Sequence, residues 1–140
     1  PPLPPPPAAP APPPVSPSPP PPPPVVVDAP VVCGRSLFSG NIKCPNPGLR
    51  PLTEQHAVRC CAPTQLDGWG FPPRDSCSVW AESAVGSWEC SADKTYAEAE
   101  AICQAQGAGA RLCTKKELED DCTLGSGCQF DKQLVWAQKI

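Results

Sequence analysis

The chain has 140 residues, of which 24 are proline and 10 are cysteine, and its formal net charge is −3. This charge offers no overall basic face for nucleic acid or anionic lipid, and no apolar run approaches the roughly 18 residues of a membrane span. We therefore expect no nucleic-acid partner and no membrane span.

The first 30 residues form a proline-rich tail. They hold 18 of the prolines, including an unbroken run from Pro19 to Pro24. Each proline ring fixes φ and removes the amide N–H, so the tail is predicted to be an extended polyproline II rod. At about 3.1 Å per residue the rod to Pro24 would span roughly 75 Å, against a diameter of about 35 Å for the rest of the chain. It is therefore long enough to touch one or two neighbouring molecules.

Residues 31–59 are predicted to be a loop-rich connector that is stapled to the following domain. The β-branched residues before Cys33 favour an extended chain, but Pro30 restricts this segment to a hinge or an added edge strand. Turn residues dominate from Gly34 to Arg59, with too little apolar material to fold alone.

Residues 60–140 are predicted to form a cysteine-rich α+β domain with two short helices and a small antiparallel sheet. Ala57–Ala62 reads as a central strand, whose adjacent cysteines should point to opposite faces and bridge in different directions. Further strands are expected at Val79–Ala81 and Ser87–Cys90, joined through Gly86, at Arg111–Cys113, and at Leu134–Ala137.

Two capping boxes predict the helices. Thr95 with Glu98 begins one, which carries an apolar stripe and stops at Gly107; Thr114 with Glu117 begins a shorter one that ends near Cys122. The stripe comprises Tyr96, Ala99, Ile102 and Cys103. The expected core comprises Val58, Val79, Trp80, Trp88, Ile102, Leu112, Leu118 and Trp136.

The cysteines indicate an oxidising, extracellular setting, since they are even in number and contain no Cys-x-x-Cys pair. All ten are predicted to form disulfides: Cys33, Cys44, Cys60, Cys61, Cys77, Cys90, Cys103, Cys113, Cys122 and Cys128. Their connectivity stays open, and short loops alone suggest Cys33–Cys44 and Cys122–Cys128. Because the chain starts at Pro1 and has no methionine, we expect a mature or partial product.

Catalysis, metal binding and cofactors are not expected. His56 is the only histidine, and no base or nucleophile motif surrounds it, so its side chain is predicted to be solvated. The acidic run from Glu117 to Asp121, followed by Asp131, lacks the alternation of a calcium loop and is predicted to be a solvated face.

The aromatic residues suggest how the tail is bound. A proline rod offers ring faces and carbonyl acceptors but no amide donors, so its receptor needs aromatic walls and N–H groups. Trp69 and Phe71, in a Gly/Pro loop, are the expected docking pair; the open alternative is a loop folded over its own aromatics. A rod that docks on the next copy makes a heterologous contact, which repeats into a homopolymeric fibre.

Two stretches resemble known families. The segment Val15–Pro24 resembles the Ser-(Pro)n blocks of hydroxyproline-rich cell-wall glycoproteins of plants and green algae, such as extensins and pherophorins. This resemblance implies O-glycosylation at Ser16, Ser18, Pro19, Pro20, Pro21, Pro22, Pro23 and Pro24.

Four further segments, Val79–Ser83, Thr95–Cys103, Arg111–Leu118 and Leu134–Trp136, look like the cysteine-rich module of green-algal mastigoneme-type glycoproteins. More distantly they are similar to the first half of a C-type lectin-like domain, without its Glu-Pro-Asn or Trp-Asn-Asp motif. The expected function is a structural subunit of an extracellular or flagellar-surface glycosylated filament. The alternative is a lectin-like carbohydrate-binding module on a proline-rich stalk.

Overall fold

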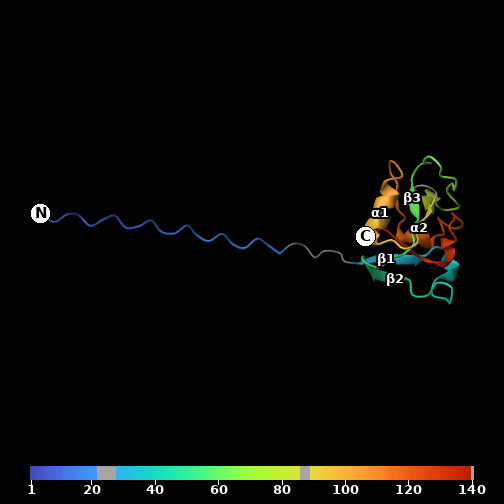
Figure 1. Ribbon diagram of the computed structural model, residues 1–140, viewed down its shortest axis with the longest axis horizontal. Helices are drawn as coiled ribbons and strands as arrows, with labels where there is room; N and C mark the ends of the chain where they lie inside the picture. The colour runs from blue at the N-terminus through green and yellow to red at the C-terminus, as the bar shows by residue number, and fades with distance from the viewer. Residues whose placement is uncertain (22–27, 86–88, 140) are drawn as a thin grey trace.

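The computed structural model describes residues 1–21, 28–85 and 89–139. Residues 1–21 contain neither helix nor strand, and every one of them is exposed. Figure 1 shows them running away from a head that begins at Asp28. The polyproline II form of the tail stays a prediction from proline stereochemistry.

The head is a small disulfide-rich α+β domain with two three-stranded antiparallel sheets. In the first sheet, β1 (Asp28–Cys33) lies between β2 (Gly48–Pro51) and β8 (Leu134–Trp136). The expectation of a hinge or edge strand here is wrong, since β1 is central. Pro30 is tolerated because it lies at the end of the hydrogen-bond ladder between β1 and β8. Its carbonyl accepts from the Ala137 amide at 2.9 Å, and the ladder needs no donor from the Pro30 nitrogen.

The second sheet has β3 (Cys60–Ala62) between β4 (Trp80–Glu82) and β7 (Arg111–Leu112), which confirms the central strand. A separate hairpin pairs β5 (Ala84–Val85) with β6 (Glu89–Cys90). The expected hairpin of Val79–Ala81 with Ser87–Cys90 is therefore replaced by a shorter one, and Gly86 lies outside the described residues.

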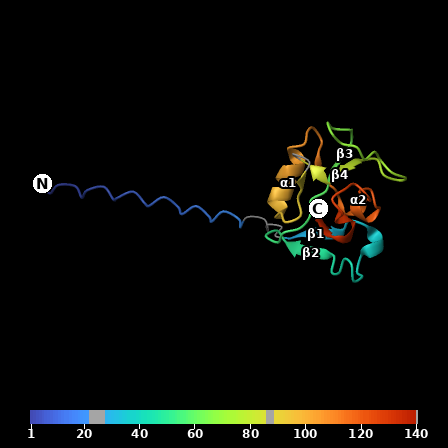
Figure 2. The ribbon, with the colours of Figure 1, turned by 45° about the vertical axis from the view of Figure 1, so that its right-hand side comes forward.

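Both capping boxes form. α1 (Tyr96–Gln104) is capped by Thr95 with Glu98, and α2 (Lys115–Glu119) by Thr114 with Glu117. α2 ends before Cys122 because Asp121 takes a left-handed conformation with φ of 58°. Two 3₁₀ turns, η1 (Ser36–Phe38) and η2 (Phe130–Lys132), complete the head (Figure 2).

All ten cysteines are paired, as expected: Cys33–Cys44, Cys60–Cys103, Cys61–Cys113, Cys77–Cys122 and Cys90–Cys128. The predicted Cys33–Cys44 bridge is confirmed, but the predicted Cys122–Cys128 bridge is wrong. The loop between Cys122 and Cys128 turns inward and buries Thr123 and Ser126. Each cysteine of this loop therefore bonds to a different neighbouring segment.

The core consists of two clusters. The first contains Val58, Leu112 and Trp136, and the second contains Val79 and Leu118, which confirms these five core predictions. Trp80 and Ile102 are only partly buried against the first cluster, and Trp88 lies outside the described residues. Residues from the segment 28–59 contribute to both clusters, so this segment and the later residues pack as one unit.

A buried cation stabilises the second half of the head. Arg59 is fully buried and donates to the Gly34 carbonyl at 3.2 Å, Thr123 Oγ1 at 3.1 Å and Asp131 Oδ1 at 2.8 Å. Burial lowers the pKa of this guanidinium, and Asp131 partly offsets the effect. A Cβ atom at Gly34 would lie 2.2 Å from the Phe130 carbonyl oxygen, so only glycine lets these segments approach.

Glu117 links the α2 cap to β7 and gives the fold a pH dependence. Its carboxylate accepts from the Thr114 amide at 2.8 Å and from Arg111 at 2.7 and 2.9 Å. Burial raises the pKa of Glu117, but the bonds from Arg111 and Thr114 outweigh it and the net pKa is lowered. A lowered pKa means that stability is present above the unfolded pKa and is lost as the pH falls.

We therefore expect the unfolding temperature of the wild type to fall more steeply than that of Glu117→Gln as the pH drops from about 5 to about 2. Circular dichroism melts over this range measure the difference. Glu119→Gln is the matched control, since Glu119 is exposed and pairs with Lys115 at 3.7 Å. Parallel profiles for the wild type and Glu117→Gln would contradict this role.

Candidate docking surfaces

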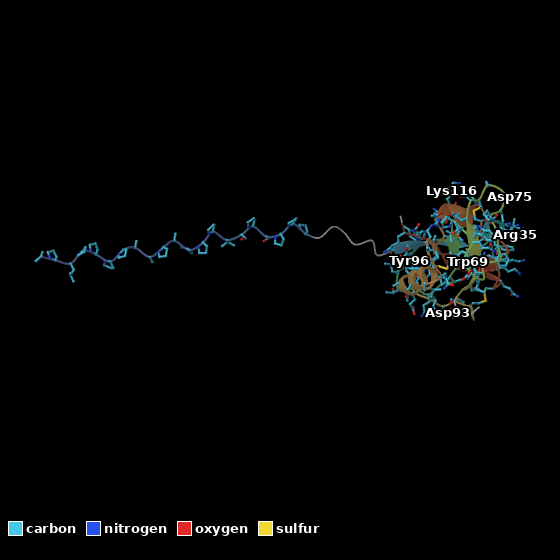
Figure 3. All side chains as sticks on the ribbon, turned by 90° about the horizontal axis from the view of Figure 1, so that it is seen from above. Arg35, Trp69, Asp75, Asp93, Tyr96 and Lys116 are labelled. Carbon is cyan, nitrogen blue, oxygen red and sulfur yellow. A yellow bond between two sulfur atoms is a disulfide. The ribbon has the colours of Figure 1, made fainter. Side chains whose placement is uncertain are left out.

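Trp69 is part of the core. Its side chain is 3% exposed and lies in the first cluster (Figure 3). Its amide donates to the Leu66 carbonyl at 3.0 Å, and its carbonyl accepts from Gln65 Nε2 at 2.8 Å. The expectation that the core least needs Trp69 is wrong for a physical reason: the loop folds back and buries its own indole.

Phe71 remains accessible, with 37% of its surface exposed. Its carbonyl accepts from the Ala81 amide at 3.2 Å, which fixes the loop beside β4. Phe71, Pro72 and Pro73 line a groove of about 350 Å³, and Arg74, which also lines it, donates to the Leu124 carbonyl. Ring faces beside a guanidinium are the chemistry expected of a proline receptor.

A second surface surrounds the loop closed by the Cys33–Cys44 bridge, which we call the stapled loop (residues 33–44). Leu37 and Ile42 on this loop are 64% and 95% exposed. The ring of Phe38 has two cations over it, with Arg35 Cζ at 5.5 Å and Lys43 Nζ at 5.2 Å from its centroid. These cations are therefore held close to exposed apolar side chains.

The stapled loop is anchored to the rest of the head. The amide and the hydroxyl of Ser36 both donate to the Asp121 carboxylate at 2.7 Å. A groove of about 470 Å³ runs between the loop, β1, β2 and α2, and among its lining residues are Ser39, Leu49 and Lys115. Leu49 is 68% exposed, so this groove has an exposed apolar side chain in its lining.

Charge is distributed unevenly along the sequence. Residues 29–53 contain Arg35, Lys43 and Arg50 but no aspartate or glutamate, although the whole chain carries a net charge of −3. The net charge does not reveal this surface, because it averages over the whole chain. The local absence of carboxylates between two cysteines was the sequence signal that could have revealed it.

The histidine and the acidic residues have structural partners. His56 is not solvated as expected: it is partly buried, lies 2.9 Å from Glu54 Oε1 and packs edge-on against Trp136. The expectation of a solvated acidic face holds for Asp120, which pairs with Lys116 at 2.6 Å on the surface. It is wrong for Glu117 and Asp131, which are partly buried against arginines. Among residues 1–21, 28–85 and 89–139, no three His, Cys, Asp or Glu side chains form a group that could hold a metal ion.

The predicted glycosylation residues lie in the tail. Ser16, Ser18 and Pro19–Pro21 are exposed, whereas Pro22, Pro23 and Pro24 lie outside the described residues. In the described part of the chain, no helix has the length and apolar character needed to cross a bilayer. The chain matches no protein-family model, no curated protein sequence and no solved structure.

The different burial of the two loop aromatics predicts different effects of their removal. Trp69→Ala should destabilise the head by about 3–5 kcal/mol, because it leaves a cavity in the first cluster. Phe71→Ala should change stability by less than about 1 kcal/mol, because that ring is partly solvated already. Chemical denaturation of both variants measures this, and equal losses would contradict the assignment.

Proposed function

We propose that this protein is a structural subunit of an extracellular glycosylated filament of the mastigoneme, cell-wall or surface-fibril type. It polymerises by docking its proline-rich tail on neighbouring subunits and catalyses no reaction. The observation that carries the proposal is a complementarity between the two parts of the chain. The tail exposes acceptors and proline rings, and the head exposes apolar grooves bordered by N–H donors.

The placement of these parts favours contact between molecules. Arg35 and Asp75 are on the side of the head that faces away from residues 1–21 (Figure 3). A stiff rod that leaves one side cannot easily bend back to surfaces on the other, so the next copy is the better partner. Such a contact is heterologous and extends into an open chain of subunits.

The cysteines support an extracellular location. Five disulfides in one small head are typical of a secreted domain that folds under oxidising conditions. They make the head a rigid unit whose grooves are formed before docking. Since the rod is also stiff, association loses little conformational entropy on either side.

Replacing residues 1–24 with a Gly/Ser chain of equal length tests the tail. We expect long polymers from the wild type and single subunits from the variant, because a flexible chain loses far more entropy on docking. Sedimentation velocity and electron microscopy distinguish the two. Polymers that persist in the variant would refute tail docking, and a monomeric wild type that binds glycans would favour the lectin-like alternative.

The sugars are tested separately. Mass spectrometry of protein from its natural source should show hexose or pentose additions on residues 15–24, and Ser16→Ala with Ser18→Ala should remove the serine-linked share. The exposed positions of Ser16 and Ser18 leave them accessible to a transferase. An unmodified tail would refute the glycoprotein part of the proposal while leaving the docking part intact.

A further inference from the structure

The edge strand β2 next to the stapled loop has an unusual set of backbone donors. Since the Pro30 carbonyl bonds toward β8, the amide groups of its neighbours on β1 face β2. Arg50 and Gly48 of β2 therefore carry the ladder bonds, and the Leu49 amide faces outward. The next outward positions are Pro47 and Pro51, which have no N–H.

This edge cannot pair with an ordinary β-strand, because one donor between two prolines does not form a ladder. It still offers a single N–H, the exposed Leu49 side chain and the rim of the 470 Å³ groove. The Ser39 hydroxyl and the Lys115 ammonium add donors along the same groove. The arrangement suits a ligand that is rich in carbonyl acceptors and apolar rings and has few backbone N–H donors.

We propose that the groove between the stapled loop, β2 and α2 binds the polyproline tail of a second copy of this chain. The inference rests on the proposed function and names the surface that receives the tail. Residues 29–53 carry no carboxylate, and the carboxylate that does line the groove, Glu119, lies 3.7 Å from the Lys115 ammonium, which offsets its repulsion of the rod carbonyls.

The segment of the tail that binds is residues 1–14. This stretch contains no serine and lies before the Ser-(Pro)n block, so the sugars expected on residues 15–24 do not obstruct it. At about 3.1 Å per residue it spans roughly 43 Å, which exceeds the head's diameter of about 35 Å. Leu3 is 91% exposed and provides an apolar side chain for the groove floor.

The predicted rod is longer than the segment that binds at the stapled-loop groove. A rod of roughly 75 Å is longer than the head, so the residues after 14 extend beyond the stapled-loop groove, and the groove at Phe71 stays a separate candidate. Residues 1–14 then determine binding at the stapled-loop groove. Variants at the two grooves should therefore affect a peptide of residues 1–14 differently.

The test measures fluorescence anisotropy of a labelled peptide of residues 1–14 with the full-length chain whose own tail carries the Gly/Ser replacement. We expect saturable binding that is at least about tenfold weaker with Leu49→Asp, because the carboxylate repels the rod and the apolar contact is lost. Lys115→Glu, at the first position of α2 where an acid suits the helix, is the second variant. Gln104→Glu on the exposed surface of α1 is the matched charge control and should leave binding unchanged.

Further measurements separate the competing occupants. Because residues 1–14 carry no charged side chain, their affinity should change less than about twofold between about 50 and 500 mM salt. Steep salt dependence would overturn the proposal in favour of an anionic partner. Sedimentation of the wild type with phosphatidylserine vesicles, abolished by Ile42→Asp, would overturn it in favour of a membrane surface.

The outcomes also separate this inference from the proposed function. If Leu49→Asp and Lys115→Glu bind the peptide as the wild-type groove does, while polymers still require the stiff tail, the groove assignment is wrong and tail docking stands. If the Gly/Ser replacement leaves the polymers intact, tail docking itself is wrong. Circular dichroism melts verify that each variant is folded before its binding is compared.

Discussion

Two adjacent cysteines in one short strand determine how the head holds together. Side chains of neighbouring residues in a strand point to opposite faces, so Cys60 and Cys61 enter the first and second core clusters respectively. Cys60 bonds to Cys103 on α1, and Cys61 bonds to Cys113 after β7. With separations of 43 and 52 residues, each bridge stabilises the fold by roughly 4 kcal/mol in the chain-entropy model. Without these bridges, a head with strands of two to six residues would have little to hold its two clusters in register.

Arg59, which precedes Cys60 and Cys61, connects the core to the stapled loop on the surface. Arg59 lies within the head and bonds to the carbonyl of Gly34, the residue that follows Cys33. The base of the stapled loop is thus fixed from inside by a guanidinium and closed from outside by the Cys33–Cys44 bridge. A loop held at both points can expose Leu37 and Ile42 without collapsing over them. The exposed apolar surface is therefore a consequence of core architecture.

The sequence predicted those features that depend on neighbouring residues and failed where distant segments compete. Both capping boxes formed because each is completed within four residues by a hydroxyl and a carboxylate. The Cys122–Cys128 pairing failed because short sequence separation does not say which way a loop turns; Thr123 and Ser126 turn it inward. Trp69 was misplaced for the same reason, since only the complete fold shows that a Gly/Pro loop closes over the first cluster. In the docking surface, the donors of β2 follow from its pairing with β1, which no local pattern specifies.

The stereochemistry of proline, which predicts a rod-like tail, also limits how copies of this protein can associate. Exposed edge strands tend to pair with other strands and aggregate, but Pro47 and Pro51 deny β2 the donors that such growth needs. Among residues 1–14 only Leu3, Ala8, Ala9 and Ala11 carry a backbone amide N–H, so tails cannot pair with one another through a continuous ladder either. For the docking that we propose, what remains is a contact between a tail with few donors and a surface with isolated donors, with one tail and one stapled-loop groove per copy. Association by that route adds subunits end to end and leaves the sheets of each head intact.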